Sequence, residues 1–425
     1  MQTQLAAEFR DTPDGQTAEA ILRRCVHCGF CTATCPTYQL LGDELDGPRG
    51  RIYLIKQVLE GAPPTRATQR HLDRCLTCRN CETTCPSGVE YGHLLDIGRK
   101  VVETRVERPA GERAVRWLLR EGLTSPLFAP AMRLGQSVRA LLPETLRAKV
   151  PERRDPGAWP TTTHPRRVLL LAGCVQPAML PHINAATARV LDAAGIQTLI
   201  APKAGCCGAL RFHLDDQVGA LADMRANIDA WWPWIAPTDG SPGVEAIVMN
   251  ASGCGVMVKD YAHALRHDPD YADKARRVSE LTRDLSELLP DLVPAWKARL
   301  GDTLPDGIAR RVVFHPPCTL QHGQKLRGCV ERYLGELGFT VTLARQESHL
   351  CCGSAGTYSV LQPGLSQQLR DRKLTHLQAE SPQVIASANI GCITHLQTGT
   401  DTPVRHWVEL VDAALASAPP HGPTV

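Results

Sequence analysis

Short apolar stretches alternate with longer amphipathic stretches through residues 166–425. The stretches RRVLLLAGC (166–174) and RRVVFHPPC (310–318) carry apolar residues on successive positions, which predicts strands buried on both faces. The amphipathic stretch NAATARVLDAAG (184–195) follows the first of them and predicts a helix. Strands that alternate with helices in this way indicate α/β units around a largely parallel sheet.

This plan occurs twice, so the C-terminal part of the chain is an internal repeat. Three segments that contain cysteines recur at offsets of 144, 145 and 138 residues: RRVLLLAGC with RRVVFHPPC, AGCCGAL with HLCCGSAG, and AIVMNASGC with VIASANIGC. We therefore predict two pseudo-repeated α/β domains, 166–300 and 301–425, with a helix-rich, proline-broken connector near 281–306.

Residues 1–107 favour a mostly helical domain. The turn Gly47-Pro48-Arg49-Gly50 opens an amphipathic helix that carries Ile52, Ile55, Val58 and Leu59 on one face. We expect this helix to pack two cysteine-rich loops together, and either Arg49 or Arg51 is a candidate cation near them or an ordinary surface residue. The stretch SGVEYGHLLDIGRKVVE (87–103) predicts a second supporting helix. The whole chain is thus predicted to be an α+β multidomain protein.

Residues 108–165 form a basic helical linker broken by proline. Residues 99–167 hold 15 Lys/Arg against 7 Asp/Glu, a local excess of +8. Two interpretations remain open: a solvated linker, or a contact surface for an acidic partner or an anionic membrane face.

Charge and cysteine content narrow the class of protein. The formal net charge of +3 is too small to indicate nucleic-acid binding as the main activity. Seventeen cysteines in a long chain argue against the disulfide framework of a small secreted domain. The polar start lacks the apolar core of a signal peptide, and the longest apolar run, Val168 to Leu180, is too short and too interrupted to span a membrane. We therefore expect a cytoplasmic protein whose membrane contact, if any, is peripheral.

Two cysteine blocks in the N-terminal domain carry the strongest chemical signal. CVHCGFCTATCP and CLTCRNCETTCP both have the C-x2-C-x2-C-x3-C-P spacing of bacterial-type ferredoxins. Three cysteines of each block can wrap one side of a [4Fe–4S] cluster, and the fourth, before a proline, reaches the other cluster. This assigns one cluster to Cys25, Cys28, Cys31 and Cys85, and the second to Cys75, Cys78, Cys81 and Cys35. Structural zinc is the alternative, but zinc sites use two separated pairs rather than a run of three.

Each C-terminal half adds four cysteines, two of them adjacent and followed by glycine. They are Cys174, Cys206, Cys207 and Cys254 in the first half, and Cys318, Cys351, Cys352 and Cys392 in the second. They are candidate ligands of a further iron–sulfur cluster; structural cysteines and thiol–disulfide chemistry are the alternatives. His315, His322 and His349 lie near the cysteine turns and could couple proton to electron movement, and Cys329 lies outside the repeat.

These halves resemble the cysteine-rich CCG domains of heterodisulfide reductase subunits and of iron–sulfur subunits of flavin-linked dehydrogenases. In the reductase form the last motif is C-x-x-C and can carry a noncubane cluster. Here Met257 and His395 replace its last cysteine, so the resemblance does not extend to that ligand, and His395 is a candidate substitute.

The full architecture, two ferredoxin blocks followed by two CCG halves, resembles the family of iron–sulfur subunits of bacterial glycolate oxidase (glycolate dehydrogenase). The segments CVHCGFCTATCPTYQLLGDELDGPRGRIYLIKQVLEG, HLCCGSAGTY and NIGCITHL carry this resemblance. It implies an electron carrier with no catalytic residue of its own, in complex with two subunits that hold FAD and oxidise glycolate to glyoxylate and D-lactate to pyruvate. Electrons would pass through this chain to a quinone or another acceptor of the respiratory chain, at the inner face of the cytoplasmic membrane.

Two other functions remain open from the sequence. The CCG halves could themselves reduce a disulfide or a quinone, or the chain could serve another donor such as glycerol 3-phosphate or L-lactate. The chain contains neither a strand–GxGxxG–helix unit nor a P-loop, so a flavin that passes single electrons to clusters is expected on another chain.

Overall fold

The N-terminal part of the chain is built from helices alone. The computed structural model describes residues 1–418 apart from 148, 239 and 302. Proline occupies the first turn of several helices, where its missing N–H costs nothing and its fixed φ suits the helix. The elements are α1 (Ala7–Arg10), α2 (Pro13–Arg24), α3 (Phe30–Ala33), α4 (Pro36–Leu41), the 3₁₀ turn η1 (Glu44–Asp46), α5 (Pro48–Leu59), α6 (Arg66–Asp73), α7 (Asn80–Thr84) and α8 (Tyr91–Arg105).

Helices α5 and α8 cross at a close contact in the core of this domain. The buried residues of α5 include Ile52, Ile55 and Val58, as the amphipathic pattern predicts. Gly98 of α8 faces Ile55, and a Cβ atom at Gly98 would come within 2.5 Å of Ile55 Cγ1. The absence of a side chain at Gly98 therefore allows the two helices to approach.

Three helices and a 3₁₀ turn connect this domain to the α/β halves. They are α9 (Ala110–Thr124), α10 (Phe128–Ser137), η2 (Arg139–Leu141) and α11 (Glu144–Arg147). Neither α9 nor α10 has a buried residue. The connection thus lies on the surface of the molecule.

The first α/β half contains a four-stranded, all-parallel sheet in the order β2-β1-β3-β4. Val168, Leu169 and Leu170 of β1 are buried, which agrees with the predicted strand. The elements are β1 (Arg166–Leu170), α12 (Gln176–Met179), α13 (Pro181–Asp192), β2 (Ile196–Leu199), α14 (Ala209–His213), α15 (Gln217–Ile235), β3 (Ala246–Met249), α16 (Ser252–Lys259), α17 (Tyr261–Ala264), α18 (Ala272–Leu281), β4 (Thr282–Asp284), the 3₁₀ turn η3 (Leu285–Leu288) and α19 (Leu289–Leu300).

The second half repeats this topology with the strand order β6-β5-β7-β8, again all parallel. Its elements are β5 (Arg311–Phe314), the π-helical turn η4 (Thr319–Gly323), α20 (Cys329–Glu336), β6 (Thr340–Leu343), α21 (Tyr358–Leu361), α22 (Pro363–Gln378), β7 (Val384–Ser387), α23 (Ile390–Gln397), β8 (Val404–His406) and α24 (Trp407–Ser417). The prediction of an α+β protein with two repeated α/β halves is confirmed.

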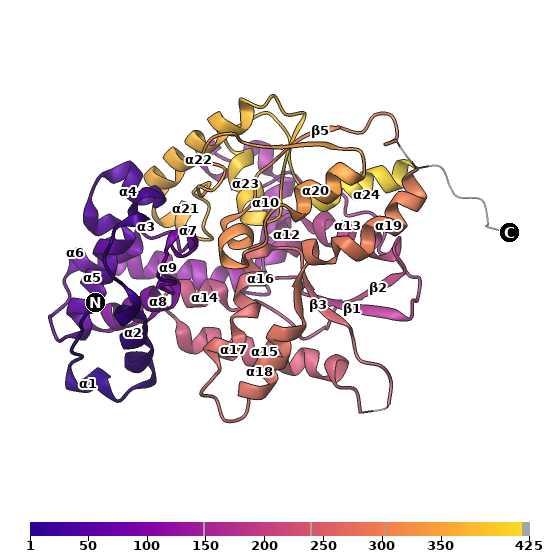
Figure 1. Ribbon diagram of the computed structural model, residues 1–425. Coiled ribbons are helices and arrows are strands. Elements are labelled where there is room, and N and C mark those ends of the chain that lie inside the picture. The colour runs from indigo at the N-terminus through magenta and orange to yellow at the C-terminus, as the bar shows by residue number, and fades with distance from the viewer. Residues whose placement is uncertain (148, 239, 302, 419–425) are drawn as a thin grey trace.

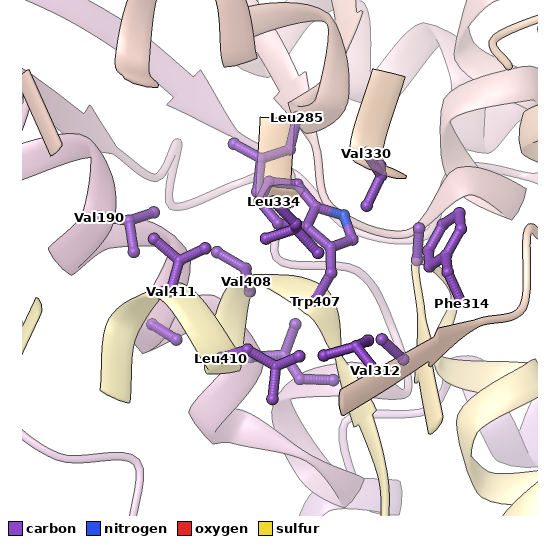
Figure 2. Packing of buried hydrophobic residues seen from close by; sticks show 14 of the residues in the cluster. Val190, Leu285, Val312, Phe314, Val330, Leu334, Trp407, Val408, Leu410 and Val411 are labelled. Carbon is purple, nitrogen blue, oxygen red and sulfur yellow. The ribbon is translucent and has the colours of Figure 1, made fainter. Parts of the chain in front are cut away.

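The two halves share one hydrophobic core, so they do not pack as separate bodies. Helix α13 of the first half lies against α24 of the second. Trp407 is fully buried in this core, with Leu334, Leu285 and Val408 around it (Figure 2). Burial of such large apolar side chains fixes the two sheets relative to each other.

The N-terminal domain docks against both halves. In Figure 1 its indigo helices lie at one end of the molecule, next to the orange helices of the second half and the magenta helix α14 of the first. Tyr358 of α21 donates a hydrogen bond to the Arg74 carbonyl at 3.1 Å, and Arg79 forms an ion pair with Asp260 at 2.7 Å. The second cysteine block therefore lies next to the interface with both α/β halves.

One strand differs from the sequence-based expectation. The region near 281–306 was expected to be a connector, but Thr282–Asp284 forms β4, the fourth strand of the first sheet, before η3 and α19. Three residues with the sequence TRD carry no apolar alternation, and their pairing with β3 makes them a strand. Among the described residues, no helix combines the length and the apolar character needed to cross a membrane.

Candidate metal centres

Three cysteines of the first block and two of the second, Cys81 and Cys85, line a first pocket. Cys25 caps the C-terminus of α2, Cys31 lies on α3, and Cys28 lies on the loop between them. Cys85, at the C-terminus of α7, closes the pocket from the other side. This first pocket has a volume of about 430 Å³, and its remaining wall is largely apolar.

The second cysteine block forms a second pocket in the same way. Cys75, Cys78 and Cys81 line it together with Cys35, which comes from the first block and caps the N-terminus of α4. Its volume is about 300 Å³. Each pocket thus brings together the four cysteines that the ferredoxin-type spacing assigned to one cluster. Cys81 lines both pockets, so they share a wall.

The two loops have the same backbone conformation. His27 and Gly29 in the first loop have φ of 60° and 88°, and Thr77 and Arg79 in the second have 51° and 56°. These positive values bend the chain so that three cysteine side chains converge, and they are costly for residues other than glycine. A conformation that recurs in both loops indicates that each loop binds the same kind of ligand.

The donor set fits a [4Fe–4S] cluster. All seventeen cysteines are free thiols and lie within the described residues. Burial raises the pKa of Cys31 to about 11 and that of Cys81 well above its usual value. These thiols would keep their protons without a cation, and a metal ion releases the protons because the thiolate is the ligand. Iron–sulfur clusters are held by four thiolates, and each pocket supplies four.

Arg49 and Arg51 are both close to the pockets but differ in environment. Arg49 lines the first pocket, is partly exposed and pairs with Glu44 at 2.6 Å. Arg51 lines the second pocket, is buried, and donates a hydrogen bond to the His71 carbonyl at 2.7 Å. The candidate cation near the second pocket is therefore Arg51. The sequence signal for its burial was the position of Arg51 four residues before Ile55, which places both side chains on the same face of α5.

Two further side chains that support the second pocket were not singled out from the sequence. Arg99 of α8 donates to the Leu72 and Cys75 carbonyls at 2.8 and 2.9 Å. Tyr91, at the start of α8, donates its hydroxyl to Cys75 Sγ at 3.6 Å. Their position in the predicted helix after the second block was the only hint of these roles.

The four cysteines of the first α/β half also come together. Side-chain hydrogen bonds connect Cys174 to Cys206, Cys206 to Cys207, and Cys207 to Cys254. The bonds from Cys174 and Cys207 hold the pKa of Cys206 well below its usual range. Asp223 lies near this thiolate, and burial together with the Cys206 charge raises the pKa of Asp223 to about 6.

The second half contains an equivalent chain of thiols that reaches the second pocket. Hydrogen bonds connect Cys318 to Cys351, Cys351 to Cys352 and Cys352 to Cys392, and Cys318 also bonds to Cys78. The thiols of the N-terminal domain and those of the second half are therefore in direct contact.

The histidines near the cysteine turns have different environments. His395 was the candidate substitute for the missing cysteine ligand. Its Nε2 atom lies 3.1 Å from Ser366 Oγ, so it has a hydrogen-bond partner in the protein. His322 contacts Thr83 Oγ1 at 2.9 Å and the His349 carbonyl at 2.8 Å, across the interface with α7. His315 alone lies among the cysteines, with a ring nitrogen within 4.8 Å of the Cys352 and Cys392 sulfur atoms. Cys329 donates a hydrogen bond to the Ser286 carbonyl at 3.0 Å, and this contact does not join it to the thiols of either half.

Comparison with known proteins agrees with this geometry. Residues 21–89 match the family described as "4Fe-4S dicluster domain", and residues 168–259 and 312–397 match the family described as "Cysteine-rich domain". The predictions of two ferredoxin-type blocks and two cysteine-rich halves are therefore confirmed.

Relatives match over nearly the whole chain. The "Glycolate oxidase iron-sulfur subunit" of Escherichia coli (strain K12) is 56% identical over 98% of this chain and 99% of its own length. The "Probable glycolate oxidase iron-sulfur subunit" of Bacillus subtilis (strain 168) is 30% identical over 94% of this chain and 92% of its own length. The "Lactate utilization protein A" of Geobacillus thermodenitrificans (strain NG80-2) is 24% identical over 58% of this chain.

Proposed function

Because this chain belongs to the family of glycolate oxidase iron–sulfur subunits, we propose that it carries electrons from the flavin subunits of a glycolate oxidase complex to the respiratory chain. The flavin subunits oxidise glycolate to glyoxylate, and D-lactate to pyruvate. Each holds FAD, and this chain contributes no catalytic residue. A bound [4Fe–4S] cluster supplies a one-electron carrier, which a two-electron donor requires.

The observation that carries this proposal is the pair of adjacent pockets with crossed cysteines. Cys25, Cys28, Cys31 and Cys85 would hold one cluster, and Cys35, Cys75, Cys78 and Cys81 the other. The shared wall at Cys81 keeps the two centres close, as a relay requires.

The surroundings of the pockets support a direction of flow. Cys28 is exposed, and the apolar side chains of Val26 and Phe30 beside it are 67% and 61% exposed. Large exposed apolar residues next to a redox site are typical of a docking surface. A flavin subunit would cover this surface, so electrons would enter at the first pocket and leave through the second.

Replacement of single ligands tests the relay. Cys28→Ser and Cys78→Ser should each abolish electron delivery to the acceptor, while glycolate still reduces the flavin in the assembled complex. Cys329→Ser is the matched control, because that thiol bonds only to the Ser286 carbonyl among the contacts described, and it should leave transfer unchanged. Wild-type transfer in both ligand variants would refute the relay. Turnover with D-lactate, L-lactate and glycerol 3-phosphate in the same complex identifies the donor.

Helices α9 and α10 are proposed to contact an anionic membrane surface at the inner face of the cytoplasmic membrane. Trp117 and Leu118 on α9, Leu134 on α10 and Leu127 directly before α10 are more than half exposed. Exposed apolar residues on basic amphipathic helices favour the interface of a bilayer with anionic lipids. Several arginines of this segment are paired internally, for example Arg116 with Asp215, so the apolar face supplies most of the binding.

Vesicle binding tests this contact. The complete chain should bind vesicles that contain phosphatidylglycerol, and Trp117→Ser with Leu118→Ser should reduce binding. Val218→Ser on α15 removes an even more exposed apolar residue elsewhere and serves as the control. If the double variant instead loses the flavin subunits and keeps vesicle binding, α9 is a protein contact and the membrane proposal fails.

A further inference from the structure

The two α/β halves share one topology but differ three residues before their first cysteine. The first half has Leu171 there and the second has His315, and both side chains are buried. Leu171 packs in an apolar cluster, as expected for a core position. His315 instead places a ring nitrogen within 4.8 Å of the Cys352 and Cys392 sulfur atoms. The repeat therefore carries a potential nitrogen ligand in one half only.

Both ring nitrogens of His315 lack a hydrogen-bond partner. The side chain is 1% exposed, and neither Nδ1 nor Nε2 has a partner among the described residues. A buried polar nitrogen without a partner is unfavourable, and such groups in native structures call for an explanation. A metal ion bound by His315 together with the neighbouring thiolates would supply the missing bond.

A second difference places a cation beside the thiols of the second half. In the first half, Gly208 of the CCG motif faces the Ala220 carbonyl, and in the second half Gly353 faces the Ser366 carbonyl, so these two carbonyls mark equivalent positions. Seven residues later, the first half has Asn227 and the second half has Lys373. The first half thus has a neutral amide, which donates to the Cys206 carbonyl at 2.6 Å, at the position where the second has an ammonium group.

Lys373 needs a negative charge that the thiolates can provide. It is 2% exposed, and its ammonium group donates to the Glu347 and Ser348 carbonyls. The carboxylate of Glu347 is already paired with Arg372 and His376. The other ionisable groups that interact with Lys373 are the thiols Cys318, Cys351 and Cys352 of the second half, which become anionic when they bind a metal ion. A buried ammonium without a counter-charge is strongly unfavourable, so a negatively charged centre fits this position.

We propose that the second α/β half holds a further iron–sulfur cluster in which His315 is the nitrogen ligand, beside thiolates drawn from Cys318, Cys351, Cys352 and Cys392. The thiols lose their protons when they bind iron. The first half, with Leu171 and Asn227 at the matching positions, does not bind this centre.

The position of the centre suits the end of a relay, a point that rests on the proposed function. Cys318 is in hydrogen-bonding contact with Cys78, which lines the second pocket. Histidine in place of cysteine raises the potential of an iron–sulfur cluster, as in Rieske centres. Electrons from the second pocket would therefore move toward this centre.

Iron content and nitrogen coupling test the proposal without any assay of glycolate oxidation. The complete wild-type chain, purified anaerobically, should contain about twelve iron and twelve sulfide, against about eight for two cubanes. Pulsed EPR of the reduced protein should detect coupling to an imidazole nitrogen. His315→Leu, which installs the residue of the first half, should lower iron to about eight and remove the nitrogen coupling.

Two further variants keep the test decisive if His315→Leu fails to fold. His315→Cys should retain the iron, lose the nitrogen coupling and shift the potential of the third centre downward. His395→Gln is the matched control, because His395 bonds to Ser366, and it should retain the coupling. Eight iron per wild-type chain, nitrogen coupling that survives in His315→Cys, or one zinc ion in place of the third cluster would each overturn the proposal. A relay defect with intact nitrogen coupling would instead count against the proposed function.

Discussion

Arg51 and Arg49 lie two residues apart on α5, so replacing each with methionine compares a buried with an exposed cation beside the clusters. The side chain of Arg51 is 1% exposed, and that of Arg49 is 35% exposed. Arg51 donates to the His71 carbonyl at 2.7 Å and to Thr37 Oγ1 at 3.2 Å. Methionine keeps an unbranched apolar side chain but lacks the guanidinium group. The comparison therefore isolates the contribution of the charge and polar contacts of each arginine.

The size of the effect follows from the environment of Asp46. This carboxylate is fully buried, 3.5 Å from Arg51, and it keeps Arg74 at 2.7 Å when Arg51 is lost. Removal of one partner of a buried ion pair costs about 3–5 kcal/mol, and the remaining contact to Arg74 favours the lower end. The exposed bridge between Arg49 and Glu44 contributes about 0–1 kcal/mol. Arg51→Met should thus destabilise the N-terminal domain by about 2–3 kcal/mol more than Arg49→Met, roughly 30- to 150-fold in the unfolding constant.

The assay is anaerobic urea unfolding of the complete chain with its clusters loaded, followed by cluster absorbance. The shift in midpoint multiplied by the slope gives the difference in free energy. Thr37→Val, which removes an acceptor of Arg51 but keeps its charge, provides a milder variant if Arg51→Met does not assemble. Equal midpoints for Arg51→Met and Arg49→Met would refute the conclusion that the buried network holds the second pocket.

Two further predictions concern the packing of α8. Gly98→Val should destabilise the N-terminal domain by about 1–3 kcal/mol, because a Cβ there would lie 2.5 Å from Ile55 Cγ1, and adding Ile55→Ala should restore part of the loss in thermal unfolding. Asp260→Asn should weaken the contact between the N-terminal domain and the first half. Burial alone would raise the pKa of Asp260, but His93 and Arg79 outweigh burial and hold this pKa well below its usual range. A carboxyl with a depressed folded-state pKa stabilises above its unfolded pKa of about 3.9, and this contribution is lost as the pH falls further. Unfolding temperatures measured from pH 7 to pH 3 should therefore fall more steeply for wild type than for Asp260→Asn, and parallel curves would contradict the assignment.

The sequence was sufficient for features encoded by local spacing or by repetition. The spacing of the cysteine blocks predicted which thiols meet in each pocket, including the exchange of Cys35 and Cys85. The matched cysteine segments predicted two halves, and both have the same strand order. Such features depend on contacts between residues close in sequence or on a copied plan, and both leave a visible pattern.

Features created by long-range contacts could not be read in this way. Strand β4 has no apolar pattern and depends on its pairing with β3. The contact of Cys78 with Cys318 joins residues 240 positions apart, and no local motif records it. The different environments of His315 and His395 also depend on tertiary packing, because both lie three residues from a cysteine. His395, three residues after Cys392, occupies the sequence position of the missing cysteine ligand, but packing places its ring against Ser366.

The crossed arrangement of the cysteines also has a consequence for assembly. Each predicted set of four thiols takes three from one block and the fourth from the other, so neither set is complete until both blocks have folded onto α5. Because a buried thiol holds its proton until a metal ion replaces it, an incomplete set would bind a cluster weakly. The buried network of Arg51, Asp46 and Thr37 joins α5 to the segments that carry Cys35 and Cys75. The same contacts that stabilise the helical domain therefore make the two cluster sites form together, which favours a chain with both centres of the relay over a chain with one.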